Sequence, residues 1–146
     1  MDRNFSEFYG YQFEDLTVGM TAAVARTVSE ADILLFAGVS GDTNPVHLDG
    51  EFGAASMFGG RIAHGMLSAS YISTVFGTKL PGAGCIYLSQ SLKFKAPVKI
   101  GDTVVARVTV KELFPEKRRA LFETVCTVAG KVVLDGQAEI LIPARK

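Results

Sequence analysis

The stretch HGMLSASYISTVFGTKL, residues 64–80 of this 146-residue chain, decides the fold. Its side chains are apolar or small almost all the way around the helix that a stretch of this length predicts. A helix without a polar face is buried instead of lying on a surface, so we expect the rest of the chain to cover this one. Pro81-Gly82 ends the helix. The small residues that would let other backbone approach it closely are Ser68, Ala69, Ser70 and Ser73.

The segment after this helix has the pattern of β-strands. Residues 103–111 alternate between polar and apolar side chains, which is typical of a half-buried strand. Further strands are predicted at 84–95, at 120–129 and after Gly130-Lys131. The turns between them indicate antiparallel neighbours. The apolar residues expected to share one face of their strand are Ile86, Leu88, Leu92, Phe94, Val104, Ala106, Val108, Val110, Val132, Leu134, Ala138, Ile140 and Ile142.

Before the long helix, the chain predicts one strand and two short helices. Residues 20–28 alternate weakly and fit a strand. Ser29 followed by Asp32 has the form of a helix N-cap with an acid at the third helical position, and it predicts a helix from about 30 to 39. A second short helix is predicted over 51–57.

The order of these elements is that of an α+β protein in which an antiparallel sheet packs against a helix. The sequence contains no internal repeat, linker or low-complexity segment. Residues 1–146 are therefore expected to form a single domain. The aromatic start of the chain lacks clean periodicity, and residues 1–10 are expected to form an N-terminal arm that packs on the body or on a partner.

The composition excludes several classes of function. Fifteen basic and fifteen acidic residues give zero net charge, unlike the basic surface of a nucleic-acid binder. No run of 18 apolar residues exists and the start lacks the apolar stretch of a signal peptide, so we expect no membrane span and a cytoplasmic location. The basic run Lys117-Arg118-Arg119 is interpreted as a solvated turn, with a contact to an anionic group as the alternative.

Two side chains suited to proton transfer lie five residues apart in a loop rich in Gly, Asn and Pro. Asp42 follows Gly41 at the predicted helix end, and His47 follows Asn44-Pro45, where the proline restricts the backbone. A rigid turn can aim a carboxylate and an imidazole at one point, and the pKa of histidine lies nearest to working pH. The pair predicts general acid–base catalysis. The alternative is a turn-capping Asp42 and a surface His47.

The start of the long helix is the second candidate feature. A helix N-terminus presents unpaired backbone N–H groups and the positive end of the helix dipole, and Gly65 has no side chain to keep a ligand away. Its N–H group could bind a carbonyl oxygen on which negative charge develops, as an oxyanion hole does. The alternative is a glycine required only for packing. His64 is interpreted as a buried, structural imidazole that orients this turn.

Other catalytic and binding motifs are absent from the sequence. Ser40 precedes Gly41 but no G-x-S-x-G elbow surrounds it, and there is no phosphate loop or GxGxxG. The two cysteines, Cys85 and Cys126, are far from any candidate base in sequence and lack CxxC or metal-ligand spacing. They are interpreted as core residues, and no metal site is expected.

Four blocks of the sequence resemble the MaoC-like, (R)-specific enoyl-CoA hydratases. The hydratase signature is matched by FAGVSGDTNPVHLD at 36–49, and a second block by IAHGML at 62–67. IYLSQSLKF at 86–94 resembles a third block, and residues 11–19 resemble the usual opening. The resemblance covers residues 11–142 in one register, and two matching blocks at family-like separation are far more specific than either block alone.

The resemblance implies a hot-dog fold, in which the sheet wraps around the helix at 64–80 and residues 30–60 form an overhang that carries the catalytic loop. It implies that Asp42 and His47 activate a water molecule for syn addition to a trans-2-enoyl-CoA, giving an (R)-3-hydroxyacyl-CoA, while the Gly65 N–H group binds the thioester oxygen. A homodimer with the site near the subunit interface is expected, and no cofactor, since CoA is part of the substrate. The residues assigned to loop organisation or substrate binding are Ser40, Asn44 and Ser73.

Two other classes of function stay open at this point. An acyl-CoA thioesterase or an acyl-carrier-protein dehydratase would share the fold, and the dehydratase is expected to carry its histidine in a different Pro- and Gly-rich motif. A non-catalytic acyl-thioester-binding module would have no need of the Asp42 and His47 pair. Acyl chain length and pathway do not follow from the sequence.

Overall fold

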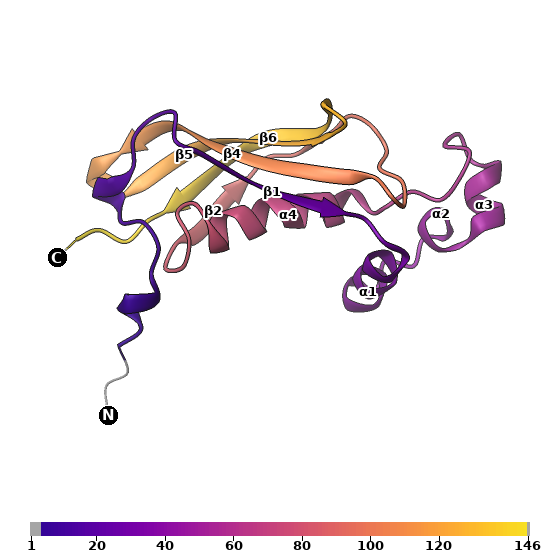
Figure 1. The fold of residues 1–146 in the computed structure, drawn as a ribbon, viewed down its shortest axis with the longest axis horizontal. Helices are drawn as coiled ribbons and strands as arrows, with labels where there is room; N and C mark the ends of the chain where they lie inside the picture. Colours follow the sequence, from indigo (N-terminus) through magenta and orange to yellow (C-terminus); the bar gives the residue numbers. More distant parts are fainter. Residues whose placement is uncertain (1–3, 146) are drawn as a thin grey trace.

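The apolar stretch around residue 70 forms helix α4, Gly65–Thr78, which lies along one face of an antiparallel sheet (Figure 1). This computed structural model describes residues 4–145 of the chain. The prediction of a buried helix is confirmed on one side only: the inner side chains face the sheet, whereas Ser70, Ser73, Thr74 and Thr78 on the outer side are exposed in the single chain. The buried residues of the inner side are Leu67, Ser68, Tyr71, Ile72, Val75 and Phe76.

The sheet has six strands in the described part of the chain, in the order β1-β4-β5-β6-β2, with the short β3 also paired to β6. All pairings are antiparallel, as the turn signals predict. Together with α4 this makes the α+β arrangement expected from the sequence. The strands are β1 Thr21–Thr27, β2 Ile86–Gln90, β3 Lys93–Phe94, β4 Thr103–Phe114, β5 Arg119–Val128 and β6 Lys131–Leu141.

The core lies between α4 and the inner face of the sheet. The alternation predicted for residues 103–111 is confirmed, since Val104, Ala106, Val108 and Val110 of β4 are almost completely buried. Phe76 of α4 meets Phe122 of β5 edge to face, with ring centroids 5.0 Å apart. The cysteines are core residues as predicted: Cys126 is buried, Cys85 is half-buried, and burial raises the pKa of the Cys126 thiol to about 12.

The single strand predicted at 84–95 is wrong, because the segment forms two strands, β2 and β3, with Ser91 between them. The chain crosses closely over β6 there: a Cβ on Gly136 would lie 1.8 Å from the carbonyl oxygen of Ser91. The apolar residues expected to share one face of this segment are not buried together within one chain, since Ile86 is 54% exposed and Phe94 54% exposed.

The inner face of β6 also differs from the prediction at one position. Val133 is buried, while Val132 is 36% exposed. The register shifts between Cys126 and Thr127, so that Thr127 pairs with Val132 but Cys126 pairs with Leu134. This bulge turns Val133 inward, because one extra residue in a strand changes the side to which its neighbours point.

Three short helices form the overhang at one end of the sheet, away from both chain ends (Figure 1): α1 Glu30–Ser40, α2 Pro45–Leu48 and α3 Gly50–Ala55. Helix α1 begins as predicted, with the Ser29 hydroxyl accepting from the Asp32 N–H group and the Asp32 carboxylate accepting from the Ser29 N–H group. The hydrogen bond that the carboxylate accepts from the Ser29 N–H group lowers the pKa of Asp32. Gly41 ends the helix at a φ of 77°, which favours glycine.

The structure adds one element that the sequence analysis did not predict, because helix α2 lies within the loop rich in Gly, Asn and Pro. Asn44 caps this helix by accepting from the Val46 N–H group, and Pro45 takes its first position. Proline is well suited to that position, since the first N–H groups of a helix have no acceptor within the helix. The same Asn-Pro pair that predicts a stiff turn therefore starts a single helical turn.

Where the N-terminal arm ends, the chain is hydrogen-bonded to the body, while Phe5 and Phe8 are 56% and 65% exposed. The Gly10 and Tyr11 N–H groups donate to the carbonyls of Ala83 and Pro81 in the loop after α4. Residues 1–3 of the predicted arm lie outside the described residues. Among residues 4–145, no helix has the length and apolar character needed to cross a membrane.

Lys117 and Arg118 of the basic run lie in the tight turn between β4 and β5, as predicted, and Arg119 is the first residue of β5. The other end of β4 is Thr103, which pairs with Thr27 just before α1. At about 3.4 Å per residue, β4 extends for about 40 Å. Within one chain, the run therefore lies far from the overhang and its loops.

The burial of one side of α4 predicts that two substitutions on this helix change the free energy of unfolding by very different amounts. Ile72→Ala, at a side chain with no exposed area, should lower the free energy of unfolding by about 3 kcal/mol, because it leaves a cavity. Thr74→Ala, at an exposed position, should change it by less than about 0.5 kcal/mol. Denaturant titration at one protein concentration measures both, and equal midpoints would contradict a buried α4.

Candidate active site

Asp42 is held in a defined position by the loop that follows α1. Its N–H group donates to the Ser40 hydroxyl at 3.1 Å, and that hydroxyl donates to the Phe36 carbonyl at 2.6 Å. One carboxylate oxygen of Asp42 accepts from the Asn44 N–H group at 3.2 Å. Ser40 and Asn44 therefore organise the loop. Asp42 caps a turn with one carboxylate oxygen, and its other oxygen does not take part in that hydrogen bond.

His47 is buried, with 8% of its surface exposed, so the alternative of a surface histidine is wrong. It lies on α2, and its Nδ1 atom is 2.8 Å from the carbonyl oxygen of Ile62. Because a carbonyl only accepts, Nδ1 carries the proton and donates. The remaining nitrogen, Nε2, is then the unprotonated atom of the neutral ring, which is the state that a general base requires.

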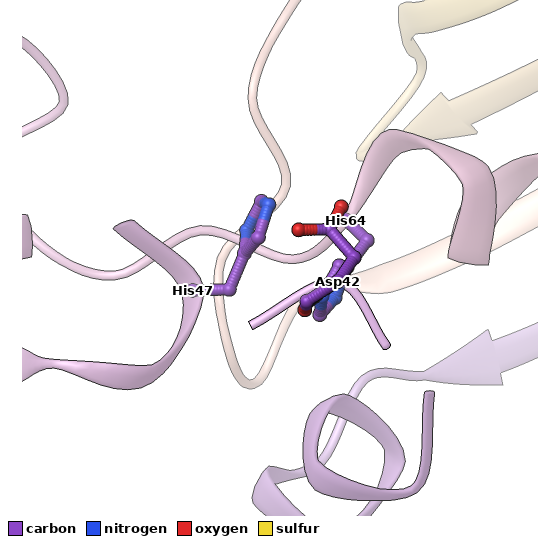
Figure 2. A group of neighbouring side chains, drawn as sticks. All are labelled: Asp42, His47 and His64. Carbon is purple, nitrogen blue, oxygen red and sulfur yellow. Dashed lines mark hydrogen bonds between the residues drawn. The ribbon is translucent and has the colours of Figure 1, made fainter. Parts of the chain in front are cut away.

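His64 connects these two residues. Its ring stacks on that of His47, with centroids 3.9 Å apart and an interplanar angle of 27°. Its Nε2–H group donates to the backbone carbonyl of Asp42 at 2.9 Å. Figure 2 shows the three side chains meeting at one place from separate segments of the chain. The interpretation of His64 as a buried residue that orients this turn agrees with these contacts.

The same three residues are the ones that offer metal ligands among the described residues. One ligand atom from each of Asp42, His47 and His64 lies within 4.8 Å of the others. Stacked rings direct their lone pairs side by side, whereas a tetrahedral metal site needs them to converge. In addition, His64 Nδ1 is fully buried. The geometry favours proton transfer over metal binding, and the absence of a metal stays a prediction.

A cavity of about 690 Å³ opens in front of these residues, a size typical of small-molecule sites. Ser40, Asp42, His47 and Gly65 all line it, so four of the six predicted site residues meet there. Its walls are mostly apolar. Wall residues that the sequence analysis did not assign to the site include Phe36, Phe58, Phe94, Val98 and Leu134.

Gly65 is the first residue of α4, so its N–H group belongs to the helix turn whose donors have no acceptor within the helix. The ring of Phe94 packs directly against it: a Cβ at Gly65 would lie 2.6 Å from Phe94 Cε1. Glycine therefore serves two purposes here. It lines the cavity without a side chain that would block a ligand, and it makes room for the ring that forms one wall.

The two remaining predicted residues, Asn44 and Ser73, do not line the cavity. Asn44 acts on the loop through its cap on α2. Ser73 is exposed on the outer side of α4, and the structure does not bring it to the site within one chain. Ser68, five residues earlier on the same helix, is buried and lines the cavity instead. The small size of Ser68 is the one feature of the sequence that could have indicated this position.

An antiparallel sheet wrapped around a buried helix, with an overhang that carries a carboxylate and an imidazole, defines a hot-dog-fold enzyme of the acid–base type. The family comparison agrees with this class. Residues 16–137 match the model of the MaoC like domain, and the chain belongs to this family.

Several relatives cover almost the whole chain. It is 58% identical to the (R)-specific enoyl-CoA hydratase of Rhodospirillum rubrum over 92% of this chain and 94% of the relative. The unliganded R-hydratase PhaJ1 from Pseudomonas aeruginosa superposes with a TM-score of 0.87 at 47% identity, covering 92% of this chain and 86% of that one. A relative from Arabidopsis thaliana, 37% identical over 88% of this chain and 78% of its own length, is named mitochondrial 3-hydroxyacyl-[acyl-carrier-protein] dehydratase.

The packing of Phe94 on Gly65 predicts that substitutions at the two positions have non-additive effects on the free energy of unfolding. Gly65→Ala should lower the free energy of unfolding by about 1 kcal/mol, because the ring must move away from the new methyl group. In a Phe94→Ala background the same substitution should cost almost nothing. A double-mutant cycle by denaturant titration measures the coupling. An equal cost in both backgrounds would show that the ring does not pack on Gly65.

Proposed function

We propose that this protein catalyses the reversible, (R)-specific hydration of trans-2-enoyl-CoA to (R)-3-hydroxyacyl-CoA. The observation that carries the proposal is that Asp42, His47 and the first residue of α4, Gly65, line one apolar cavity. Hydration of a conjugated thioester needs a group that takes a proton from the attacking water, a group that delivers a proton to C2, and stabilisation of charge on the carbonyl oxygen. The cavity supplies a group for each of these needs. The high identity to a hydratase over nearly the whole chain supports the same reaction.

Asp42 and His47 together would hold and activate the attacking water. Their polar atoms lie close enough for one water molecule to contact both. The water oxygen forms the new bond to C3, the pair accepts a proton from the water, and a proton is delivered to C2. The net reaction adds one water molecule, so the pair returns to its starting state. Because both groups act from one side of the cavity, the addition is expected to be syn.

The Gly65 N–H group would bind the thioester oxygen while the double bond is attacked. Negative charge moves onto that oxygen when the new bond forms at C3. A backbone donor at the N-terminus of a fourteen-residue helix stabilises this charge, because the helix dipole adds to the hydrogen bond. The donor is fixed before the reaction, so little reorganisation is needed.

The test of this proposal is the ultraviolet absorbance of crotonyl-CoA mixed with the purified protein, with a thiol reagent in a parallel reaction. Loss of the enoyl absorbance without release of thiol is the expected result. Release of thiol would identify a thioesterase. Binding of the thioester without either change would identify a binding module and contradict catalysis.

An acyl-carrier-protein thioester is the second candidate substrate, and the named dehydratase among the relatives favours considering it. A dehydratase that acts on carrier-protein thioesters was expected to carry a different histidine motif. The relative named as such a dehydratase nevertheless matches this chain over 88% of its length, so the motif does not distinguish a CoA substrate from a carrier-protein substrate. Comparing kcat/KM for crotonyl-CoA and crotonyl-carrier protein distinguishes them. We expect the CoA thioester to be preferred.

We also propose that the protein works as a homodimer, formed at the edge of the sheet beside β2. This strand pairs with β6 on one side only, and Ile86, Tyr87 and Leu88 are 54%, 38% and 40% exposed. An open edge with apolar side chains favours pairing with another chain. Asp42 and Ser73 are exposed in the single chain, which fits a site near the interface. The cytoplasmic location stays a prediction.

The acid–base roles predict that Asp42→Asn and His47→Gln each lower kcat at least about a hundred-fold, the usual effect of losing such a group. Both variants should keep the fold, because the amide side chains preserve shape. Glu51→Gln, at an exposed carboxylate on α3, is the control and should keep kcat. Near-normal turnover in either of the first two variants would remove that residue from the mechanism.

The edge-strand dimer predicts a mass of twice 15.6 kDa in solution. Leu88→Lys should shift the protein toward the monomer and lower its activity, because a charge on an edge strand opposes pairing. Glu112→Lys, at an exposed site on β4, should stay dimeric. Light scattering measures the mass, and a fully active wild-type monomer would contradict the proposal.

A further inference from the structure

Arg61 lies four residues before the start of α4 and has no role in the proposed reaction. Its guanidinium group makes three hydrogen bonds. Nε donates to the backbone carbonyl of His47 at 2.7 Å, while Nη1 and Nη2 donate to the two carboxylate oxygens of Glu30 at 2.7 and 3.1 Å. The side chain of Arg61 is 18% exposed. This planar, two-point pairing with a carboxylate is specific to arginine.

Ile62, the residue after Arg61, contacts the imidazole ring of His47. The Ile62 carbonyl accepts from the His47 ring, and the Ile62 N–H group donates to the Val46 carbonyl at 3.2 Å. The segment 61–62 therefore contacts both the backbone and the ring of His47. Helix α2 has only four residues, too few to be stable alone, so its position depends on such contacts.

Glu30 and Asp42 lie at opposite ends of α1. Glu30 is its first residue, and Asp42 follows the Gly41 cap at its other end. Arg61 links His47 to the N-terminal end of α1, because it bonds both the His47 carbonyl and Glu30. Asp42 is linked to the C-terminal end of α1 directly through the backbone. Helix α1 thus serves as a common reference for the two groups that act on one water molecule.

We propose that Arg61 is a positioning residue for His47, and that Glu30 orients the Arg61 guanidinium group for this task. The inference rests on the proposed function. Arg61 holds the His47 backbone so that the ring keeps its Nδ1–H bond to Ile62 and presents Nε2 to the cavity. Small displacements of a catalytic group are costly, since about 1 Å lowers the rate on the order of a hundred-fold.

The test compares Arg61→Gln, Arg61→Lys and Glu30→Gln with a control. Arg61→Gln should lower kcat for crotonyl-CoA at least about tenfold and change KM less than about threefold, because the residue acts on His47 and not on substrate. Arg61→Lys should recover part of kcat, and Glu30→Gln should lie between Lys and wild type. Arg26→Gln, at an exposed arginine with a 3.8 Å contact to Asp32 on the same overhang, should leave kcat unchanged.

A second measurement reports on the ring directly. The chain has two histidines, so nitrogen-15 spectra of the imidazoles contain two sets of signals, and His47→Gln assigns them. In the wild type, His47 should be protonated at Nδ1 and His64 at Nε2. In Arg61→Gln the His47 signals should average between the two tautomers, while those of His64 stay in place.

Three results would overturn the proposal: kcat within twofold of wild type in Arg61→Gln, a rise in KM alone, or His47 signals that do not change. A rise in KM alone would make Arg61 a substrate contact. If the wild type hydrates no enoyl thioester, the proposed function fails, but the spectra of the two histidines still decide whether Arg61 positions His47.

Discussion

The burial of helix α4 is the constraint on which the rest of the structure depends. The inner side of the helix is mostly apolar, so the sheet must cover it, and the strands that follow the helix in sequence do so. Its N-terminus nevertheless emerges at a cavity, where the first N–H groups lack acceptors within the helix. The packing that stabilises the fold therefore also places a fixed backbone donor, Gly65, at the candidate site.

The polar atoms around this donor are held mainly by backbone carbonyls. Each imidazole donates one N–H group to a carbonyl, His47 to Ile62 and His64 to Asp42, and the two rings stack. These contacts fix one tautomer for each ring and leave His47 Nε2 as the basic atom of the neutral pair. In the proposed reaction, the side chains that would transfer protons are therefore in place before substrate enters, and this preorganisation is a main structural requirement for acid–base catalysis.

Much of the fold could be predicted from the sequence, because α4, β4 and the capped start of α1 follow from local pattern and turn chemistry. The resemblance brought Asp42, His47 and Gly65 together correctly. Local pattern failed where distant segments decide the outcome: Ser91 crossing over Gly136 divides one predicted strand, and a bulge turns Val133 inward. The ring of Phe94 on Gly65 and the Arg61 contacts join residues far apart in sequence, which periodicity cannot detect.

The central claim is that Asp42 and His47 act on one water molecule from one side of the substrate. The most direct test is proton NMR of the product formed from crotonyl-CoA in D2O, in which the deuterium at C2 and the hydroxyl at C3 report the faces of addition. The account predicts (R)-3-hydroxybutyryl-CoA with both groups added to the same face of the double bond. Addition to opposite faces, an (S) product or a mixture would contradict it.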